Sequence, residues 1–573
     1  MTGGRAGRLL VLLLGALLFP GSVPPGAAAP FDLGVREMVL DAGLARVEKP
    51  RRARVREITG PATLDQPDTE YVLQNDIATE GTAFTVAASD VTLNLNGYTV
   101  TYGTRDAEAA YGVLIEGEKR KNVALVNGRI VQGEGECRGK PGTGKNCNPV
   151  YAYETFGLEI GGIGISYRSA DTHGIYLQWG RDARIHHSVV RDSGTEVKDR
   201  HQGIDALRAG RVVNAHVHHN VIRTRQVGIR VGEEGEVHHN EVQIDSRVTN
   251  SVGLSMQSGS LHHNKVYGYG VHPIGIWPGR NGKVFSNYVE VQSTRKGDEY
   301  GDTGAACLRM TWGTGDGVEV MYNTFLLRAS RDYQGTGFNS WGRALFVGLP
   351  RAEQKAEFHD NVIIALNDDG EAKAAAIAVV CDNASPSLVF RNNRVESNWA
   401  NVLLADSYGA ADGYPQFIGN TFVKRDDYST YRTVRSQYSS RPSTGVFTGN
   451  TMVNGASLEN ADLEFSGKGK KEIRVGRRLA VEVQDASGAP LRDARVVVKD
   501  SEGEPVFEGA TDENGRVVAD VVRYLLTNMR GGETTGKRMT IKKTPHTLIV
   551  SHREKSRKKR VRGEGDETVL VRL

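Results

Sequence analysis

The chain has 573 residues, a formal net charge of +4 and 68 glycines. Glycine at about 12% exceeds the usual share of roughly 7%, yet no strict three-residue glycine period exists, which excludes a collagen. Apolar residues make up 39% of the chain and contain a single long apolar run, which excludes a polytopic membrane protein. The excess glycine therefore needs a structural explanation.

The first residues have the order of a secretory signal peptide. Arg5 and Arg8 precede an apolar run from Leu9 to Phe19, and prolines and alanines follow it up to Ala29. A run of about 11 apolar residues is too short to span a bilayer. We predict a signal peptide at 1–29, an N-terminal extension at 30–59, and a secreted, periplasmic or cell-surface protein with no transmembrane segment after cleavage. A retained anchor or a buried helix is the alternative.

The next elements look like stacked strands and a closed loop. Residues 89–100 and 122–128 alternate apolar and polar side chains, which is typical of strands with one buried face. Cys137 and Cys147 flank a glycine-rich loop, and in an exported protein a local disulfide is the simplest interpretation. Cys307 and Cys381 lie in apolar stretches, which predicts buried thiols.

A motif ending in asparagine repeats along most of the chain. The spacings between successive copies are 20, 24, 23, 36, 38, 32, 27 and 30 residues. A second motif, small–apolar–any–apolar, precedes most copies and predicts a short strand. Strands at this period, each followed by a stacked Asn, predict a parallel β-helix of roughly 12–13 coils between Asn96 and Asn450. A leucine-rich repeat is the runner-up, but its helical half is missing. The repeated asparagines are Asn220, Asn240, Asn264, Asn287, Asn323, Asn361, Asn393, Asn420 and Asn450.

We expect each repeated Asn to adopt the tight-turn backbone conformation and to bond the equivalent Asn one coil along. Four copies carry a histidine pair directly before the Asn position, which predicts two columns of stacked imidazoles. Neutral imidazoles also bind copper or zinc, but no carboxylate or thiol recurs beside them, so we predict no metal site. The pairs are His186–His187, His218–His219, His238–His239 and His262–His263.

The opening Val-Thr-Leu-Asn-Leu-Asn-Gly-Tyr-Thr-Val at 91–100 and the Asn-ended coils resemble the secreted right-handed parallel β-helix superfamily. It includes pectate-lyase-like enzymes, polygalacturonases, alginate lyases and epimerases, and NosD-like periplasmic proteins. The resemblance implies an all-β protein with a right-handed parallel β-helix at 60–465. It implies no particular activity, because these families share a scaffold and differ in their sites.

The register changes near the C-terminus. Residues 466–472 look like a linker, and 473–573 resemble the carboxypeptidase-regulatory or prealbumin-like β-sandwich on the turns at 488–491 and 511–515. Such modules are usually stalks, caps or binding units. A basic run at 553–562 predicts an exposed hairpin loop, or alternatively a surface that adheres to an acidic glycan. Nucleic acid is not an expected partner of an exported chain.

The residue after each inward apolar residue of the first strand should face outward. This rule predicts an outward column of Tyr176, Asp205, Arg230, Ser255, Trp277, Arg309 and Phe346, beside a floor of outward glycines at 174, 203, 228, 253 and 275. Guanidinium groups pair with carboxylate or sulfate, so the strip suits an acidic sugar chain. The alternative is that loops cover the strip and its charges pair with one another.

Two long insertions border this column. Residues 193–201 supply His201, and residues 292–304 supply Asp298, Glu299 and Tyr300. β-Elimination or epimerisation of a uronic acid needs a group that neutralises the carboxylate and a base. Hydrolysis needs two carboxylates, for which Asp205 with a loop carboxylate is the candidate. The polygalacturonase motif set is absent, which disfavours the hydrolase.

We therefore expect a monomer that acts on an acidic polysaccharide by β-elimination or epimerisation. A non-catalytic surface or periplasmic binding protein is the alternative. The sequence predicts no definite cofactor, and calcium is the one ion whose binding it leaves undecided. The expected catalytic residues are Asp205, Arg230, Arg309 and His201, and the expected substrate-binding residues are Tyr176, Trp277, Ser255, Phe346, Asp298, Glu299 and Tyr300.

Overall fold

The structure is a computed structural model. It describes residues 54–117, 119–139, 146–169, 172–194, 205–246, 251–270, 272–293, 304–310, 315–329, 342–348, 354–367, 373–380, 387–405, 411–426, 428–436, 440–562 and 565–573. The predicted signal peptide lies outside these ranges, as do Cys381, His201, Asp298, Glu299 and Tyr300. Within these ranges, no helix is long and apolar enough to cross a membrane.

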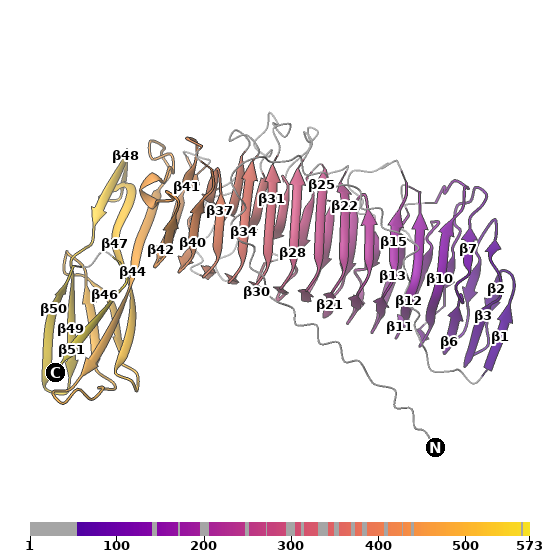
Figure 1. Cartoon of the computed structure of the whole chain (residues 1–573), viewed down its shortest axis with the longest axis horizontal. Coiled ribbons are helices and arrows are strands. Elements are labelled where there is room, and N and C mark those ends of the chain that lie inside the picture. The colour runs from indigo at the N-terminus through magenta and orange to yellow at the C-terminus, as the bar shows by residue number, and fades with distance from the viewer. Residues whose placement is uncertain are drawn as a thin grey trace, which may run out of the picture. The chain divides into compact units, whose positions relative to one another are not determined.

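Most of the chain forms coils, and each coil contributes one strand to a long parallel sheet, here called sheet B (Figure 1). Short strands β9 (Arg120–Lys121) and β17 (Val212–Val213) extend its pairings. The successive strands of sheet B are β2 (Ala62–Leu64), β5 (Phe84–Val86), β8 (Val113–Ile115), β11 (Val150–Phe156), β13 (Ile175–Arg181), β16 (Asp205–Ala209), β20 (Val227–Val231), β23 (Val252–Met256), β26 (Ile274–Trp277), β29 (Ala306–Met310), β32 (Gly342–Gly348), β35 (Ala374–Val380), β38 (Ala400–Leu404) and β41 (Arg432–Ser436).

The second sheet, sheet A, holds two series of parallel strands that flank the repeated Asn. The series before the Asn comprises β1 (Arg54–Ile58), β3 (Thr69–Leu73), β6 (Val91–Asn94), β10 (Ala124–Gln132), β12 (Glu159–Tyr167), β14 (Arg184–His186), β18 (His216–His218), β21 (Gly235–His238), β24 (Gly259–His262), β27 (Lys283–Phe285), β30 (Val318–Met321), β33 (Ala356–His359), β36 (Leu388–Arg391), β39 (Gln416–Ile418) and β42 (Ser443–Thr448). The series after it comprises β4 (Ile77–Ala78), β7 (Thr99–Tyr102), β15 (Val189–Asp192), β19 (Val221–Thr224), β22 (Glu241–Ser246), β25 (Lys265–Gly270), β28 (Tyr288–Ser293), β31 (Thr324–Ala329), β34 (Val362–Asn367), β37 (Arg394–Ser397), β40 (Thr421–Lys424) and β43 (Thr451–Val453). Strands β10 and β12 are long enough to belong to both series.

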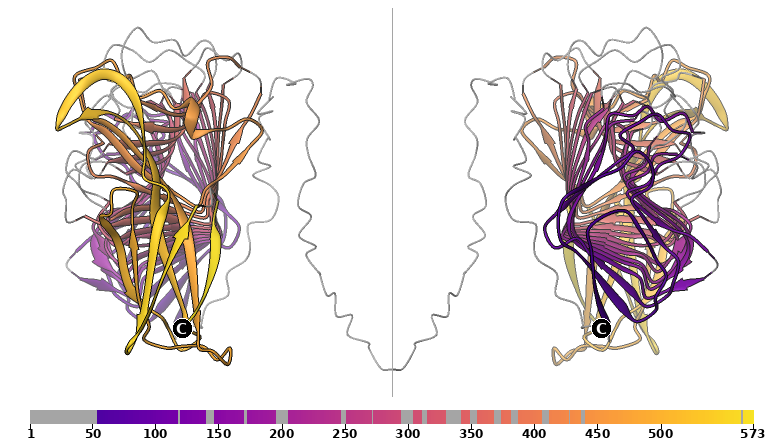
Figure 2. Two further views of the ribbon diagram at one scale, coloured as in Figure 1. Left: turned by 90° about the vertical axis from the view of Figure 1, so that its left-hand side faces the viewer. Right: turned by 90° about the vertical axis from the view of Figure 1, so that its right-hand side faces the viewer.

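These pairings confirm the parallel β-helix. Strands of successive coils superpose when the stack is viewed end-on in Figure 2. Between Asn96 and Asn450 the described residues place twelve strands of sheet B, β8 to β41, which agrees with the predicted coil number. Strands β2 and β5 add two earlier coils. The predicted disulfide between Cys137 and Cys147 is present, and Cys307 is a buried free thiol as expected.

The C-terminal region forms two sheets around one apolar core. Its strands are β44 (Lys471–Gln484), β45 (Arg495–Lys499), β46 (Pro505–Ala510), β47 (Arg516–Arg530), β48 (Glu533–Lys542), β49 (His546–His552), β50 (Lys555–Val561) and β51 (Glu567–Arg572). The core between the sheets includes Val481, Val496, Val550 and Val571. Its relation to the carboxypeptidase-regulatory modules stays a prediction.

Two details of this region differ from the sequence interpretation. Strand β44 starts inside the predicted linker, and its first six residues pair with β42 of the last coil. One C-terminal sheet has four strands in the order β46–β45–β49–β50. The basic run at 553–562 is mostly its edge strand β50, which forms a hairpin with β49, so the run is a strand and not a loop. Exposed lysine and arginine side chains on an edge strand oppose pairing with other chains.

The asparagine ladder is the most regular feature of the β-helix. Asn264 donates from its backbone N–H and from Nδ2 to Oδ1 of Asn287, both at 3.0 Å. Asn287 donates in the same way to Oδ1 of Asn323, at 2.9 Å from each nitrogen. Its Nδ2 also donates at 2.8 Å to the carbonyl of Leu261 in the preceding coil. The predicted bond between successive asparagines is therefore confirmed.

The expected backbone conformation of the ladder residues is wrong by one position. The residue directly before each ladder Asn has the positive φ, for example 55° at His219, 54° at His239 and 56° at Tyr322. The ladder Asn itself is buried and holds its neighbours through the side chain. Histidine, asparagine and aspartate tolerate the left-handed region better than most residues, which explains why they recur at this position.

The histidine pairs form the predicted stacked columns. The rings of His186, His218, His238 and His262 stack at centroid distances of 4.9–5.1 Å, and Phe285 continues this column at 4.6 Å. The second histidines stack at 4.9–5.0 Å. Burial, followed by the charge of neighbouring imidazoles, lowers the pKa of His218 and of His238 to about 4.

These lowered pKa values predict a pH-dependent stability. Between about pH 6.5 and pH 4 the unfolded chain binds protons that the folded imidazoles do not, so stability that is full above pH 6.5 falls as the pH drops. We expect a melting temperature lower by a few degrees at about pH 5 than at about pH 7.5. A His218→Phe/His238→Phe variant should lose part of this dependence, because Phe285 already occupies the same column in the next coil. Equal melting temperatures of the wild-type protein at both pH values would contradict the prediction.

Candidate functional site

The outer face of sheet B carries one column of polar and aromatic side chains that is partly open to solvent. The strand register aligns Tyr176 with Arg208, Arg208 with Arg230, Arg230 with Ser255, and Ser255 with Trp277. We call these five residues the outer strip. Adjacent parallel strands lie about 4.8 Å apart, so the strip presents one side chain per coil at a regular spacing.

The register corrects the predicted position of Asp205. Arg208, which the sequence interpretation missed, occupies the place in the column that was predicted for Asp205. Asp205 aligns instead with Val227, in a neighbouring column that is buried. The interval between the aligned strand residue and the ladder Asn does not identify Arg208 from the sequence, because Leu207 precedes Asn220 by 13 residues whereas Ile229 precedes Asn240 by 11.

Asp205 lies beside the strip and pairs with two of its arginines. Its side chain has no exposed surface, and its Oδ1 lies 3.2 Å from Nη2 of Arg230. Its Oδ2 lies 3.6 Å from Nε of Arg208. The side chains of Arg230 and Arg208 keep 34% and 28% of their surface exposed. One buried carboxylate therefore anchors two arginines whose outer parts reach solvent.

The electrostatics around Asp205 follow from its burial. Desolvation raises the pKa of Asp205 to about 6, although Arg230 and Arg208 oppose the shift. His173, in the preceding coil, accepts the backbone N–H of Asp205 at Nδ1, 2.9 Å away. Burial, and then the charge of Arg208, lowers the pKa of His173 to about 3, so this imidazole is neutral at neutral pH.

Aromatic rings of the strip contact two arginines, Arg208 and Arg309. The Arg208 guanidinium lies 5.3 Å from the ring centre of Tyr176, which in turn packs on His173 at 4.6 Å. At the other end of the strip, the Arg309 guanidinium lies 5.0 Å from the ring centre of Trp277. Cation–π contacts of this kind hold the guanidinium planes in place.

Several predicted binding residues are buried. Phe346 is 1% exposed and lies in an apolar cluster on the outer face of sheet B with Ala378, Trp399 and Leu403. Tyr176 and Arg309 are each 4% exposed. The accessible part of the column is therefore Arg208, Arg230, Ser255 and Trp277. The alternative expectation, that the outward column is covered, holds at Arg309 and Phe346.

The predicted glycine floor is wrong. A Cβ atom added to Gly275 would meet Cγ1 of Val289 at 2.2 Å, and one added to Gly253 would meet Cγ1 of Val266 at 2.5 Å. Both valines are fully buried in the core. These glycines therefore face the interior, where sheet B comes close to the strands that follow the ladder Asn, and no larger residue fits there.

The remaining candidates of the sequence interpretation are not placed. His201, Asp298, Glu299 and Tyr300 lie outside the described residues, so a base or a second carboxylate from these loops stays a prediction. Among the described residues, no group of three or more His, Cys, Asp or Glu side chains is arranged to hold a metal ion.

No protein-family model matches this chain, and no curated protein matches its sequence. Solved structures show only distant similarity. The tailspike protein of E. coli bacteriophage HK620 in complex with pentasaccharide is 12% identical, with a TM-score of 0.40, over 86% of this chain and 87% of the other. The catalytic unit of a GH87 alpha-1,3-glucanase from Streptomyces thermodiastaticus is 11% identical, with a TM-score of 0.35, over 73% and 71%. PfbA, a surface adhesin of Streptococcus pneumoniae, is 10% identical, with a TM-score of 0.25, over 79% and 90%. Similarity at this level assigns no function.

The inward direction of the glycines can be tested by adding one methyl group. Gly275→Ala should lower the free energy of unfolding by about 1–3 kcal/mol or more, because the interior has no space for the methyl group. Gly60→Ala is the matched control, since a Cβ there meets no atom within 4 Å. Thermal melts of both variants measure the difference. If Gly275→Ala were as stable as the control, Gly275 would face outward and the claim that it faces the interior would be contradicted.

Proposed function

We propose that the outer strip of sheet B binds an acidic polysaccharide. The observation that carries the proposal is the anchoring of two partly exposed arginines by one buried carboxylate. Asp205 pairs with Arg208 and Arg230, whose side chains keep 28% and 34% of their surface exposed. Guanidinium groups fixed in this way pair with a carboxylate or sulfate in two-pronged geometry.

The neighbouring residues suit a sugar chain laid across the strands. Ser255 and Trp277 follow Arg230 on the next two strands, so a hydroxyl group and an indole continue the column beyond the cationic centre. An aromatic face packs against the apolar face of a sugar ring, and the serine hydroxyl bonds with ring hydroxyl groups. A chain running along the helix axis would meet these groups one coil after another.

Asp205 supports this site without touching the ligand. Because its carboxylate has no exposed surface, it does not reach a glycosidic bond, and we assign it the positioning of the two arginines. This role replaces the one expected from the sequence, in which Asp205 is one of two hydrolytic carboxylates.

Lyase or epimerase activity is the second candidate, favoured by the partial exposure of Arg230, whose side chain keeps 34% of its surface open to solvent. In such a reaction Arg230 would neutralise the uronate carboxylate. The base would come from loop residues such as His201 or Tyr300. Secretion or a surface location, and the monomeric state, remain predictions beside both candidates.

Replacing one strip arginine tests the binding proposal. Arg230→Gln should weaken binding to an acidic polysaccharide such as polygalacturonate or alginate about 10- to 100-fold, because one charge-assisted contact contributes roughly 1.5–3 kcal/mol. Arg223→Gln is the matched control, since Arg223 lies on β19 of sheet A, the strand directly before β20, and is not part of the outer strip. Titration calorimetry measures both variants, with neutral dextran as the ligand control. Equal losses in the two variants, or equal affinity for dextran, would contradict the proposal.

The same preparations separate binding from catalysis. Incubation with each acidic polysaccharide, with and without calcium, is followed by ultraviolet absorbance of unsaturated uronate and by reducing ends. Asp205→Asn should weaken binding, because the neutral amide no longer pairs with the two guanidinium groups that the carboxylate holds in position. Product formed by the wild-type protein would favour the lyase or epimerase. Binding without product favours the non-catalytic protein.

A further inference from the structure

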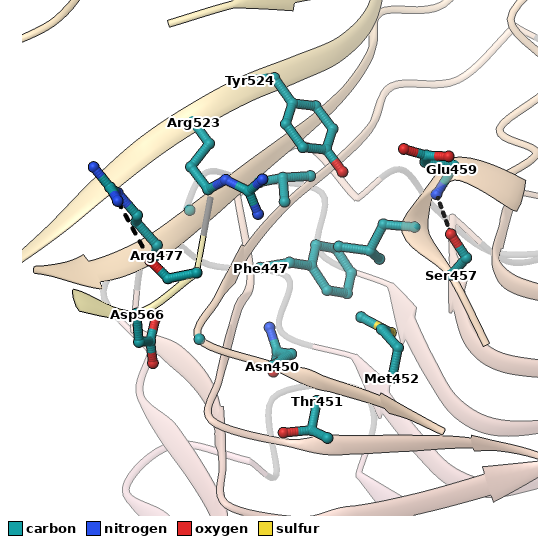
Figure 3. A pocket seen from close by; sticks show the side chains of 15 residues that line it. Phe447, Asn450, Thr451, Met452, Ser457, Glu459, Arg477, Arg523, Tyr524 and Asp566 are labelled. Carbon is teal, nitrogen blue, oxygen red and sulfur yellow. Dashed lines mark hydrogen bonds between the residues drawn. The ribbon is translucent and has the colours of Figure 1, made fainter. Parts of the chain in front are cut away.

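A second site lies at the end of the β-helix, away from the outer strip. A cleft of about 440 Å³ is lined by residues of the last coil and by C-terminal strands β44 and β47 (Figure 3). Its volume is in the range of roughly 300–1,000 Å³ that is typical of small-molecule sites. The last coil contributes Phe447, Asn450, Met452 and the 3-10 helix η2 (Leu458–Asn460).

The asparagine ladder ends at this cleft. Oδ1 of Asn450 accepts the backbone N–H and Nδ2 of Asn420 at 2.8 and 3.2 Å, and its Nδ2 donates to the carbonyl of Phe417 at 2.8 Å. In the eight preceding coils the backbone N–H and Nδ2 of the ladder Asn also donate to the next Asn. Asn450 has no successor, so among the described residues its backbone N–H and its second Nδ2 hydrogen have no acceptor. Asn450 lines the cleft, and Figure 3 shows its side-chain amide among the other lining side chains.

Charged side chains add further donors and acceptors. Arg523 of β47 lines the cleft beside Tyr524, and within the described part of the chain no carboxylate lies within ion-pair distance of it. Arg477 of β44 is 1% exposed, and although it bonds Glu567, its Nε and Nη2 atoms have no hydrogen-bond partner among the described residues. Glu459 and Asp566 provide the acceptors.

The cleft is balanced in charge and has an apolar wall. Its lining contains two arginines and two carboxylates, so it has no net preference for an anion or a cation. Phe447, Met452, Leu458 and the ring of Tyr524 form the apolar part. A pyranose ring has the same combination, because its hydroxyl groups donate and accept hydrogen bonds while one ring face is apolar. A polar site rejects a ligand that leaves its buried groups unpaired, which gives such a cleft selectivity.

We infer that this cleft binds a neutral hexopyranose unit. The ring packs on Tyr524 and Met452, its hydroxyl groups accept from Asn450 and Arg523, and they donate to Glu459 and Asp566. The site does not depend on the outer strip, which we propose to recognise acidic units. The two sites together would suit a polymer that contains both neutral and acidic sugars.

The test measures binding of methyl α-D-glucoside, methyl α-D-galactoside and methyl α-D-mannoside to the full chain by saturation-transfer NMR and calorimetry. We expect at least one of them to bind in the millimolar range or tighter. Arg523→Gln should weaken this binding at least tenfold. Arg530→Gln, on the exposed end of the same strand β47, and Arg230→Gln on the outer strip should leave it unchanged. Circular dichroism and melting temperature verify that each variant is folded.

The outcomes separate this site from the proposed function. Loss of acidic polysaccharide binding in Arg230→Gln with retained hexopyranoside binding supports two independent sites. Failure of all three glycosides to bind overturns the inference, as does equal binding by Arg523→Gln. Glucuronate that binds more tightly than the neutral glycosides, and is lost in Arg523→Gln, overturns the assignment to a neutral sugar.

Discussion

The hydrogen-bonded asparagine ladder is the constraint on which the rest of the β-helix depends. Each ladder Asn from Asn240 to Asn420 joins three coils: it accepts from the coil before, donates to a carbonyl of that coil, and donates to the coil after, as Asn287 does. The coils differ in length by many residues, with ladder spacings from 20 to 38. The ladder fixes one turn of every coil, so the extra length is placed in the loops and the strands stay in register.

The two sites follow from this register in opposite ways. On sheet B, the alignment places Arg208 and Arg230 side by side, so that one buried carboxylate pairs with arginines of two successive strands. The ladder ends at Asn450 in the last coil. This residue keeps hydrogen-bond donors that, in each of the eight preceding coils, bond the Asn of the next coil. Regular stacking therefore creates the strip, and the end of the stacking creates the cleft.

The sequence predicted repeating features better than local directions. The ladder positions, the histidine columns and the disulfide followed from spacing alone, because each repeats or closes a short loop. The inward direction of Gly275 could not be predicted from spacing. Gly275 and Ile276 are neighbours in β26 and both face inward, so the alternation of inward and outward residues fails at that point. The burial of Phe346 is caused by packing on the outer face of sheet B, which alternation within its own strand does not report. The misplacement of Asp205 arose because the number of residues between the strand of sheet B and the ladder Asn differs from coil to coil.

Hydrogen exchange of an Asn287→Ala variant tests the role of the ladder most directly. The substitution leaves the donors of Asn264 and the carbonyl of Leu261 unpaired in the interior, at a cost of roughly 3 kcal/mol or more. We predict exchange at least tenfold faster in β24, β26, β27 and β30, together with a lower melting temperature. Asn75→Ala, at an exposed Asn outside the ladder, should change neither. Unchanged exchange and melting in Asn287→Ala would contradict the claim that the ladder holds the coils in register.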